Sequence, residues 1–189
     1  MRALALLALA ASPGLVSFAW AHAPAINDQP STAQAPFLID DPEHSKAIYA
    51  ELDGDADYYW ITSEEPFDFY VGITAARVEG CPLERTFSFE VMTPEGEVID
   101  GRDGASFEWW AWYEEFGEQW YWVGPEIGAD FQSDRVYEAG DYVVRVFNDG
   151  NEGRYVLAVG DDERFGPAVL ATLPMVLRKS GAWWEAAGC

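Results

Sequence analysis

The chain has 189 residues, with 33 acidic and 11 basic side chains, and its formal net charge at pH 7 is −22. This charge argues against a nucleic-acid-binding protein, because phosphates would be repelled, and it favours cations or cationic partners. Nine Trp, nine Tyr and eleven Phe residues also argue against a disordered chain, which lacks the apolar side chains of a core. The composition predicts a folded, acidic domain.

Residues 1–21 have the features of a secretory signal peptide. Met1-Arg2 is a short positive end, Ala3 to Val16 is apolar, and Ala19-Trp20-Ala21 is an A-x-A cleavage pattern. The apolar run is too short for a membrane span. We expect cleavage after Ala21, export to the periplasm or beyond, and His22 as the mature N-terminus.

The rest of the chain predicts an all-β fold, an antiparallel, jelly-roll-like β-sandwich. Residues 22–36 are rich in Ala, Pro, Asn, Gln, Ser and Thr, which indicates a flexible N-terminal arm without packed structure. Residues 37–165 contain short alternating runs separated by turn residues at spacings of roughly 8 to 12, a pattern typical of sandwiches. The expected strands are Ser45–Leu52, Tyr58–Thr62, Phe67–Thr74, Thr86–Met92, Glu97–Asp100, Asp141–Phe147 and Arg154–Gly160.

The clearest local pattern lies between Gly140 and Gly160. Two runs of alternating β-branched and aromatic residues flank a turn, Asn148 to Gly153, that is rich in Asn and Gly. This combination predicts an antiparallel hairpin. We expect Tyr142, Val144 and Val146 to share one face of its first strand, and Tyr155, Leu157 and Val159 to share one face of its second.

Residues 166–189 predict a C-terminal amphipathic tail. Its apolar part, Pro167 to Leu177, is interrupted by Pro174 and followed by Arg178-Lys179. A run this short cannot span a bilayer, which requires about 20 apolar residues. We expect either a short helix docked on the sandwich or a weak contact with a membrane surface, and Trp183-Trp184 suits both.

Several segments, taken in order from Ser45 to Val159, resemble the bacterial pre-peptidase C-terminal family of β-sandwich domains. They are Asp55-Ala-Asp57-Tyr-Tyr59, Phe69 to Ile73, Phe89 to Gly96, Ala139-Gly-Asp-Tyr-Val-Val-Arg-Val146 and Gly153-Arg-Tyr-Val-Leu-Ala-Val159. The resemblance implies a domain that is mostly a non-catalytic appendage of secreted hydrolases, implicated in binding polymers, folding or localisation. The start Ala21-His22-Ala23-Pro24 also resembles a group of exported bacterial proteins, and that resemblance implies no activity.

The segment from Phe107 to Trp122 is the candidate binding surface. Aromatic residues alternate here with glutamates in a way that places aromatic rings on both faces of a strand. One interpretation is a hairpin packed against the sheet and the C-terminal segment. The other is an exposed surface that stacks on sugar rings or anchors a protein partner. The candidate ligand-binding residues are Trp109, Trp110, Trp112, Tyr113, Trp120 and Trp122.

Two groups of residues could bind metal ions. Asp53, Asp55 and Asp57 alternate in a turn and could hold Ca²⁺, although a solvated turn with Asp side chains bonded to their own backbone is the favoured interpretation. His22 would offer an α-amine and an imidazole for copper, with His44 as a further nitrogen ligand. We expect no other cofactor.

Cys81 and Cys189 are the two cysteines of the chain. In an oxidising compartment they could form a disulfide that ties the C-terminal tail to the middle of the chain. The alternatives are two free thiols, or a bridge from Cys189 to another molecule.

The sequence shows no nucleophile elbow and no HExxH motif, so it predicts a protein that is not an enzyme. Paired carboxylates are abundant, but no pair stands out as a glycosidase pair. We therefore expect an exported, non-catalytic binding or accessory module for carbohydrate or another envelope component. The alternatives are a periplasmic protein that handles Ca²⁺ or copper, and a structural partner in an envelope protein complex.

Overall fold

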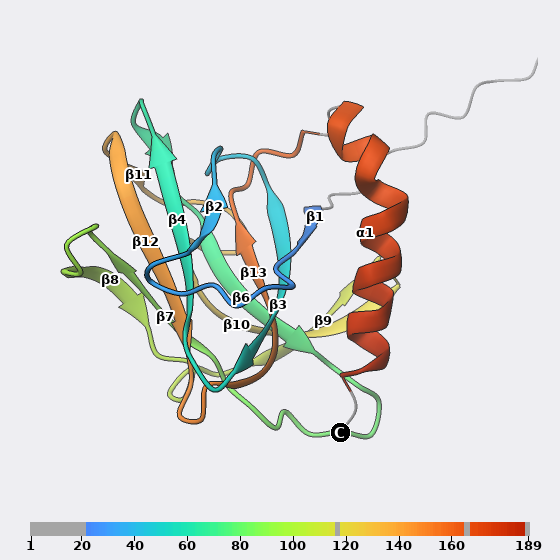
Figure 1. Ribbon diagram of the computed structural model, residues 1–189. Coiled ribbons are helices and arrows are strands. Elements are labelled where there is room, and N and C mark those ends of the chain that lie inside the picture. The colour runs from blue at the N-terminus through green and yellow to red at the C-terminus, as the bar shows by residue number, and fades with distance from the viewer. Residues whose placement is uncertain (1–21, 116–117, 165–166, 188–189) are drawn as a thin grey trace, which may run out of the picture.

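The computed structural model describes residues 22–115, 118–164 and 167–187, which form two facing β-sheets and one long helix (Figure 1). The predicted β-sandwich is confirmed. The first sheet has the order β1-β3-β13-β6-β10-β9 and the second has the order β2-β4-β12-β7-β8, while β11 and β5 form a small separate pair. Most neighbours are antiparallel, but β1 runs parallel to β3 and β2 runs parallel to β4.

The strands of the six-stranded sheet are β1 (Ala23–Ile26), β3 (Lys46–Asp53), β6 (Val71–Ala76), β9 (Trp110–Glu114), β10 (Gln119–Ile127) and β13 (Glu152–Val159). Those of the five-stranded sheet are β2 (Phe37–Ile39), β4 (Asp57–Ser63), β7 (Ser88–Met92), β8 (Val98–Arg102) and β12 (Gly140–Phe147). The small pair consists of β5 (Phe67–Asp68) and β11 (Val136–Tyr137).

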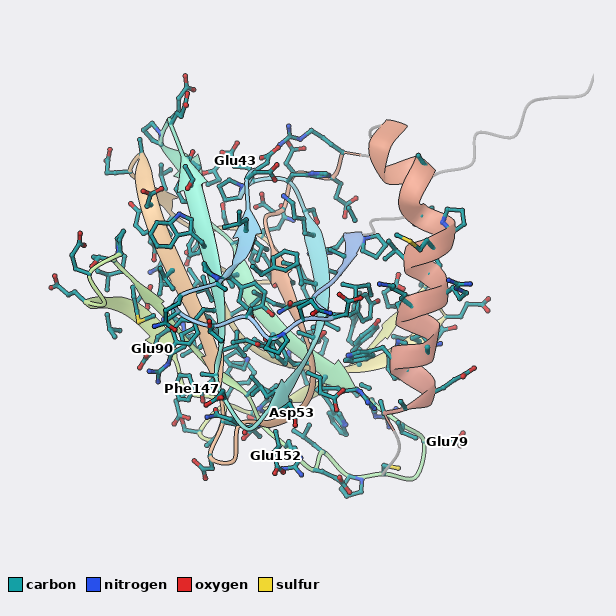
Figure 2. All side chains as sticks on the ribbon, in the orientation of Figure 1. Glu43, Asp53, Glu79, Glu90, Phe147 and Glu152 are labelled. Atoms are coloured by element: carbon teal, nitrogen blue, oxygen red, sulfur yellow. The ribbon has the colours of Figure 1, made fainter. Side chains whose placement is uncertain are left out.

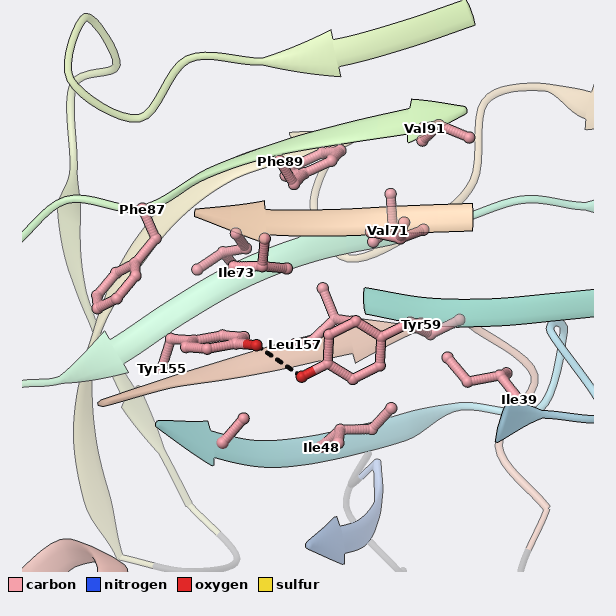
Figure 3. Packing of buried hydrophobic residues seen from close by; sticks show 14 of the residues in the cluster. Ile39, Ile48, Tyr59, Val71, Ile73, Phe87, Phe89, Val91, Tyr155 and Leu157 are labelled. Atoms are coloured by element: carbon pink, nitrogen blue, oxygen red, sulfur yellow. Dashed lines mark hydrogen bonds between the residues drawn. The ribbon is translucent and has the colours of Figure 1, made fainter. Parts of the chain in front are cut away.

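The core lies between the inner faces of the two sheets (Figure 3). Residues at alternate positions point inward because side chains along a strand alternate between its two faces. Tyr155, Leu157 and Val159 on β13 and Val144 and Val146 on β12 are completely buried, as their shared faces predict. The other aromatic side chains with at most 1% of their surface exposed are Tyr59, Phe69, Tyr70, Phe87 and Phe89.

The predicted hairpin at Gly140–Gly160 is wrong in its pairing. Both strands form and the turn is tight, but β12 pairs with β4 and β7, whereas β13 pairs with β3 and β6. The two strands therefore belong to opposite sheets. The turn carries the chain across the sandwich, with Asn151 and Gly153 at positive φ, so the apolar faces of both strands meet in the core rather than side by side.

The predicted flexible arm is also wrong for the described part of residues 22–36. β1 pairs with the edge of β3, with a hydrogen bond from Ala23 N to Ser45 O at 2.9 Å. Further along, Ser31 is buried and its hydroxyl donates to Asp57 Oδ1 at 2.8 Å. This segment has a composition typical of linkers, but it is ordered because its backbone and side-chain groups form hydrogen bonds with the sheets.

Helix α1 (Pro167–Glu185) covers part of the outer face of the six-stranded sheet, alongside β1 (Figure 1). The predicted short helix is confirmed in type but continues well past Pro174. Val176 and Ser180 are buried against the sheet, and the indole of Trp183 donates to Ala50 O at 3.0 Å. Met175 and Leu177 stay exposed, and the predicted membrane-surface contact stays a prediction. No helix in the described part of the chain is long and apolar enough to cross a membrane.

Candidate functional site

The candidate site is the hairpin of β9 and β10, which forms one edge of the six-stranded sheet. The strands are antiparallel, with Trp112 opposite Tyr121 and Tyr113 opposite Trp120. Opposite residues share a face of the sheet, so alternate positions separate into two sets. We call the face toward α1 the covered face; it carries Trp110, Trp112, Glu114, Gln119 and Tyr121. We call the other face the open face; it carries Ala111, Tyr113, Trp120 and Trp122.

The open face presents two aromatic rings to solvent. Tyr113 is 40% exposed and Trp120 is 44% exposed, and their ring centroids are 5.2 Å apart. The Arg77 guanidinium lies 4.9 Å from the centroid of Trp120 and 5.3 Å from that of Trp122, within the range of cation–π contacts. Trp122 itself is partly buried against the core. The open face is therefore an aromatic surface supported from its inner side by Arg77 and Trp122.

Trp109 has a structural role instead of a place on either face. Its indole N–H donates to Gly104 O at 2.8 Å, and its ring packs against Gly124. A Cβ at Gly124 would lie 2.3 Å from the ring, so the glycine is required for this close approach. Trp109 is one of the six predicted ligand-binding residues, but these contacts give it a structural role in the fold.

The covered face lines a cavity of about 210 Å³ between the sheet and α1, which we call the helix pocket. Aromatic rings follow one another around it: Phe131 lies 4.8 Å from Trp112, Trp112 lies 6.0 Å from Tyr121, and Tyr121 lies 5.1 Å from Trp184, between centroids. Tyr49 on β3 completes this wall, since its hydroxyl is 3.1 Å from that of Tyr121. The pocket is also bordered by His22, Thr74, Glu114, Gln119, Leu177, Ser180 and Gly181.

Two polar atoms at the helix pocket are closed off from solvent without a hydrogen-bond partner among the described residues. They are Nε2 of His22 and Nε1 of Trp184. Burial lowers the pKa of His22 to about 4, against a smaller opposing effect of the Asp161 charge, so the imidazole is neutral at physiological pH. The other two such atoms belong to Ser45 and Arg145.

The hydroxyls of Tyr49 and Tyr121 stay protonated over the physiological range. Burial raises the pKa of both phenols, and the negative charge of Glu114 raises them further. For Tyr121, the Tyr49 hydroxyl and the nearby Trp184 N–H oppose the rise in pKa. The Glu114 carboxylate thus acts on both hydroxyls at the pocket wall.

Phe131 closes one side of the helix pocket on a short turn. Its ring meets Trp110, Trp112 and His22, the last in an edge contact with centroids 6.4 Å apart. Its backbone φ of 63° lies in the left-handed region, which is unfavourable for a bulky residue. The turn is held by Glu126, whose Oε2 accepts from Phe131 N at 3.2 Å and from the Tyr70 hydroxyl at 2.9 Å.

The three aspartates predicted to bind Ca²⁺ do not act as one group. All three border a cleft of about 750 Å³, but Asp57 is buried and accepts hydrogen bonds from Ser31 and from the Tyr155 hydroxyl, at 2.8 and 2.7 Å. Asp53 and Asp55 are exposed in the turn. Among the described residues, no group of three or more His, Cys, Asp and Glu side chains is placed to hold a metal ion. The arrangement gives the calcium prediction no support.

The two histidines and the cysteines are placed as follows. His22 lines the helix pocket, whereas His44 Nε2 lies 2.7 Å from Arg164 O at another edge of the sandwich. Cys81 lies in the loop after β6. Cys189 lies outside the described residues, so the Cys81–Cys189 bridge and its alternatives stay predictions.

Sequence reasoning missed most of the helix pocket. Tyr49 falls within a predicted strand, Phe131 belongs to no predicted element or site, and Trp184 lies in the predicted C-terminal tail. No periodic signal connects these positions, because the sheet order and the docking of α1 bring them together. The run of alternating aromatic residues was the one usable signal, and it pointed to the hairpin.

No protein-family model matches the chain, and no curated protein matches it. Among solved structures it is similar to the pre-peptidase C-terminal domain of collagenase from Bacillus anthracis, at 12% identity and a TM-score of 0.35, over 71% of this chain and 98% of that one. It is also similar to the catalytic domain of a GH87 alpha-1,3-glucanase in complex with nigerose, at 16% identity and a TM-score of 0.29, over 64% of this chain and 23% of that one. The same domain in complex with tetrasaccharides gives 17% identity and the same TM-score and coverage. Likenesses at this level carry no information on function.

Proposed function

We propose that the protein is an exported, non-catalytic binding module that holds carbohydrate of the envelope or its surroundings against the open face. The observation that carries this proposal is the pair Tyr113 and Trp120, two adjacent rings that each leave about two fifths of the side chain exposed. Exposed Trp and Tyr rings combine an apolar face with a polar edge, which suits the apolar faces of sugar rings.

Polar groups around the two rings support this choice of ligand. Arg77 places N–H donors over the ring of Trp120, and Glu115 and Glu118 are exposed beside the hairpin turn. Carboxylates accept hydrogen bonds from hydroxyl groups, and guanidinium groups donate to sugar oxygens. The surface therefore offers stacking together with both kinds of hydrogen bond.

The acidic surface fits a neutral polymer better than an anionic one. Asp53, Glu79 and Glu152 lie on the periphery of the sandwich in Figure 2, in keeping with the net charge of −22. Such a field repels phosphate-rich and sulfate-rich polymers. We therefore expect uncharged polysaccharides to be retained.

The test is a pull-down on insoluble neutral polysaccharides. Replacing both rings of the open face, Tyr113→Ala with Trp120→Ala, should abolish retention on any polysaccharide that retains the unaltered protein. Trp110→Ala is the matched control, because this side chain is 41% exposed but belongs to the covered face. Undiminished retention of the double variant would rule out the open face as the carbohydrate site.

A further inference from the structure

We propose that the helix pocket is a second, independent binding site, and that its ligand is a small quaternary or methylated ammonium ion with the chemistry of choline. This site uses the covered face of the hairpin together with β1, β3 and α1, and it shares no residue with the pair Tyr113 and Trp120. The proposal therefore does not depend on carbohydrate binding at the open face.

The first observation is the arrangement of rings around the pocket. Phe131, Trp112, Tyr121 and Trp184 follow one another at centroid separations of 4.8 to 6.0 Å, and Tyr49 adjoins Tyr121. The faces of aromatic rings carry negative electrostatic potential, and several rings around one space attract a methylated cation. Such a cage binds the cation without the strong hydrogen bonds that a primary ammonium needs.

The second observation is the sign of the charge at the pocket. Glu114 borders it, and no lysine or arginine is present among the described residues that line it. The His22 imidazole adds no positive charge, because burial keeps it neutral, and Asp161 acts on His22 from beyond the pocket. Cleavage after Ala21 would leave an α-ammonium group on His22, whose charge Glu114 and Asp161 oppose. A cation is thus favoured over an anion locally, and the net charge of −22 draws cations from solution.

The third observation is a pair of buried polar atoms, His22 Nε2 and Trp184 Nε1, that make no hydrogen bond of normal geometry; the Trp184 N–H only approaches the Tyr121 hydroxyl. A buried polar atom without a partner is unfavourable, and the described chain places two of its four such atoms at this one cavity. The Trp184 N–H can donate to an oxygen, and the His22 nitrogen can accept or donate according to its tautomer. A ligand that carries a hydroxyl beside its ammonium group, as choline does, matches both kinds of group.

The test compares three probes that separate charge, methylation and shape. They are choline, its uncharged isostere 3,3-dimethylbutan-1-ol, and ethanolamine, which keeps the charge but lacks the methyl groups. Binding is followed by calorimetry and by the fluorescence of the tryptophans. We expect choline to bind at least about tenfold more tightly than either other probe, the size of effect that cation–π contacts in a desolvated cage produce.

Two substitutions place the binding in the pocket. Glu114→Gln and Trp112→Leu should each weaken choline binding about tenfold while leaving the weak binding of the isostere unchanged. Glu115→Gln is the matched control, since it removes the same charge from the next residue, whose side chain is exposed and does not line the pocket. Vesicles of phosphatidylcholine form a further arm: free choline competing with vesicles would assign a lipid headgroup, and binding of free choline alone would assign a solute.

Three outcomes, measured on the unaltered protein or on the Glu115→Gln control, would overturn the proposal. They are equal affinity for choline and the isostere, absence of saturable choline binding at millimolar concentration, and a loss of choline binding in Glu115→Gln as large as that in Glu114→Gln. Retention on polysaccharides is measured separately, so failure of either site is recognised independently of the other.

Discussion

The two faces of the β9–β10 hairpin are made from the same kinds of residue but have different surroundings. Trp112 and Tyr113 are neighbours in the chain, yet Trp112 contacts Tyr121 and Phe131 in the helix pocket, whereas Tyr113 stands 40% exposed beside Trp120. The difference arises from α1 and the Phe131 turn, which lie over one face only. What a residue in this hairpin can bind is therefore decided by what covers its face.

The largest effect that would test this comparison is expected from Trp184→Ala. The substitution removes the ring that joins α1 to Tyr121, and deleting a large, mostly buried aromatic side chain costs about 2–4 kcal/mol. Denaturation in guanidinium should report this loss of stability, and polysaccharide retention by the open face should persist under native conditions. Unchanged stability would show that α1 is not held by this contact.

The second largest effect is expected from His22 beside the covered face, which should make the free energy of unfolding depend on pH. The pKa of His22 falls from 6.5 in the unfolded chain to about 4 in the fold, so the unfolded chain binds an extra proton between these values. Stability should therefore rise with pH across this window by about 3 kcal/mol, reach its full value above pH 6.5, and be lost as pH falls toward 4.

The measurement is urea denaturation of the unaltered protein and of His22→Gln across that window. Burial raises the pKa of Asp57, which gives a slope of the opposite sign, but this contribution is common to both proteins and cancels in their difference. Identical slopes in the two proteins would contradict a buried, neutral His22.

The smallest change in the free energy of unfolding is expected from a substitution on the open face. Trp120→Ala should change the free energy of unfolding by no more than about 0.5 kcal/mol, because the ring is 44% exposed and its contacts are with Tyr113 and Arg77. The same denaturation series gives the value. A cost comparable to that of Trp184→Ala would mean that both faces are structural and would remove the contrast between them.

Much of the sandwich follows from the sequence because a strand with one buried face has a period of two. The inward faces of β12 and β13 are those that the alternation of Val144, Val146, Tyr155 and Leu157 predicts. Their partners are not predictable in this way. A short turn between two strands looks the same in sequence whether the strands pair or cross between sheets, and here the crossing is decided by long-range packing.

The candidate site was predictable only in part. Alternating aromatic residues identified the hairpin, but they could not separate Trp112 from Tyr113, since the cover over one face comes from distant segments. Ordering of the arm was equally hidden, because it depends on partners such as Asp57 that lie on the far side of a turn. Carbohydrate binding, metal binding and the disulfide remain predictions.

The helix pocket takes its walls from opposite extremes of the described chain, His22 beside β1 and Trp184 in α1. His22 precedes β1 and Trp184 follows β13 in the chain, so the sandwich can close before the pocket exists. Proteolytic trimming before β3, or a cut in the loop that leads to α1, would then remove the pocket and leave most of the core in place. Ligand binding there would thus report that the segment with β1 and the segment with α1 are both still attached, a property that the hairpin's open face, built from neighbouring strands, cannot report.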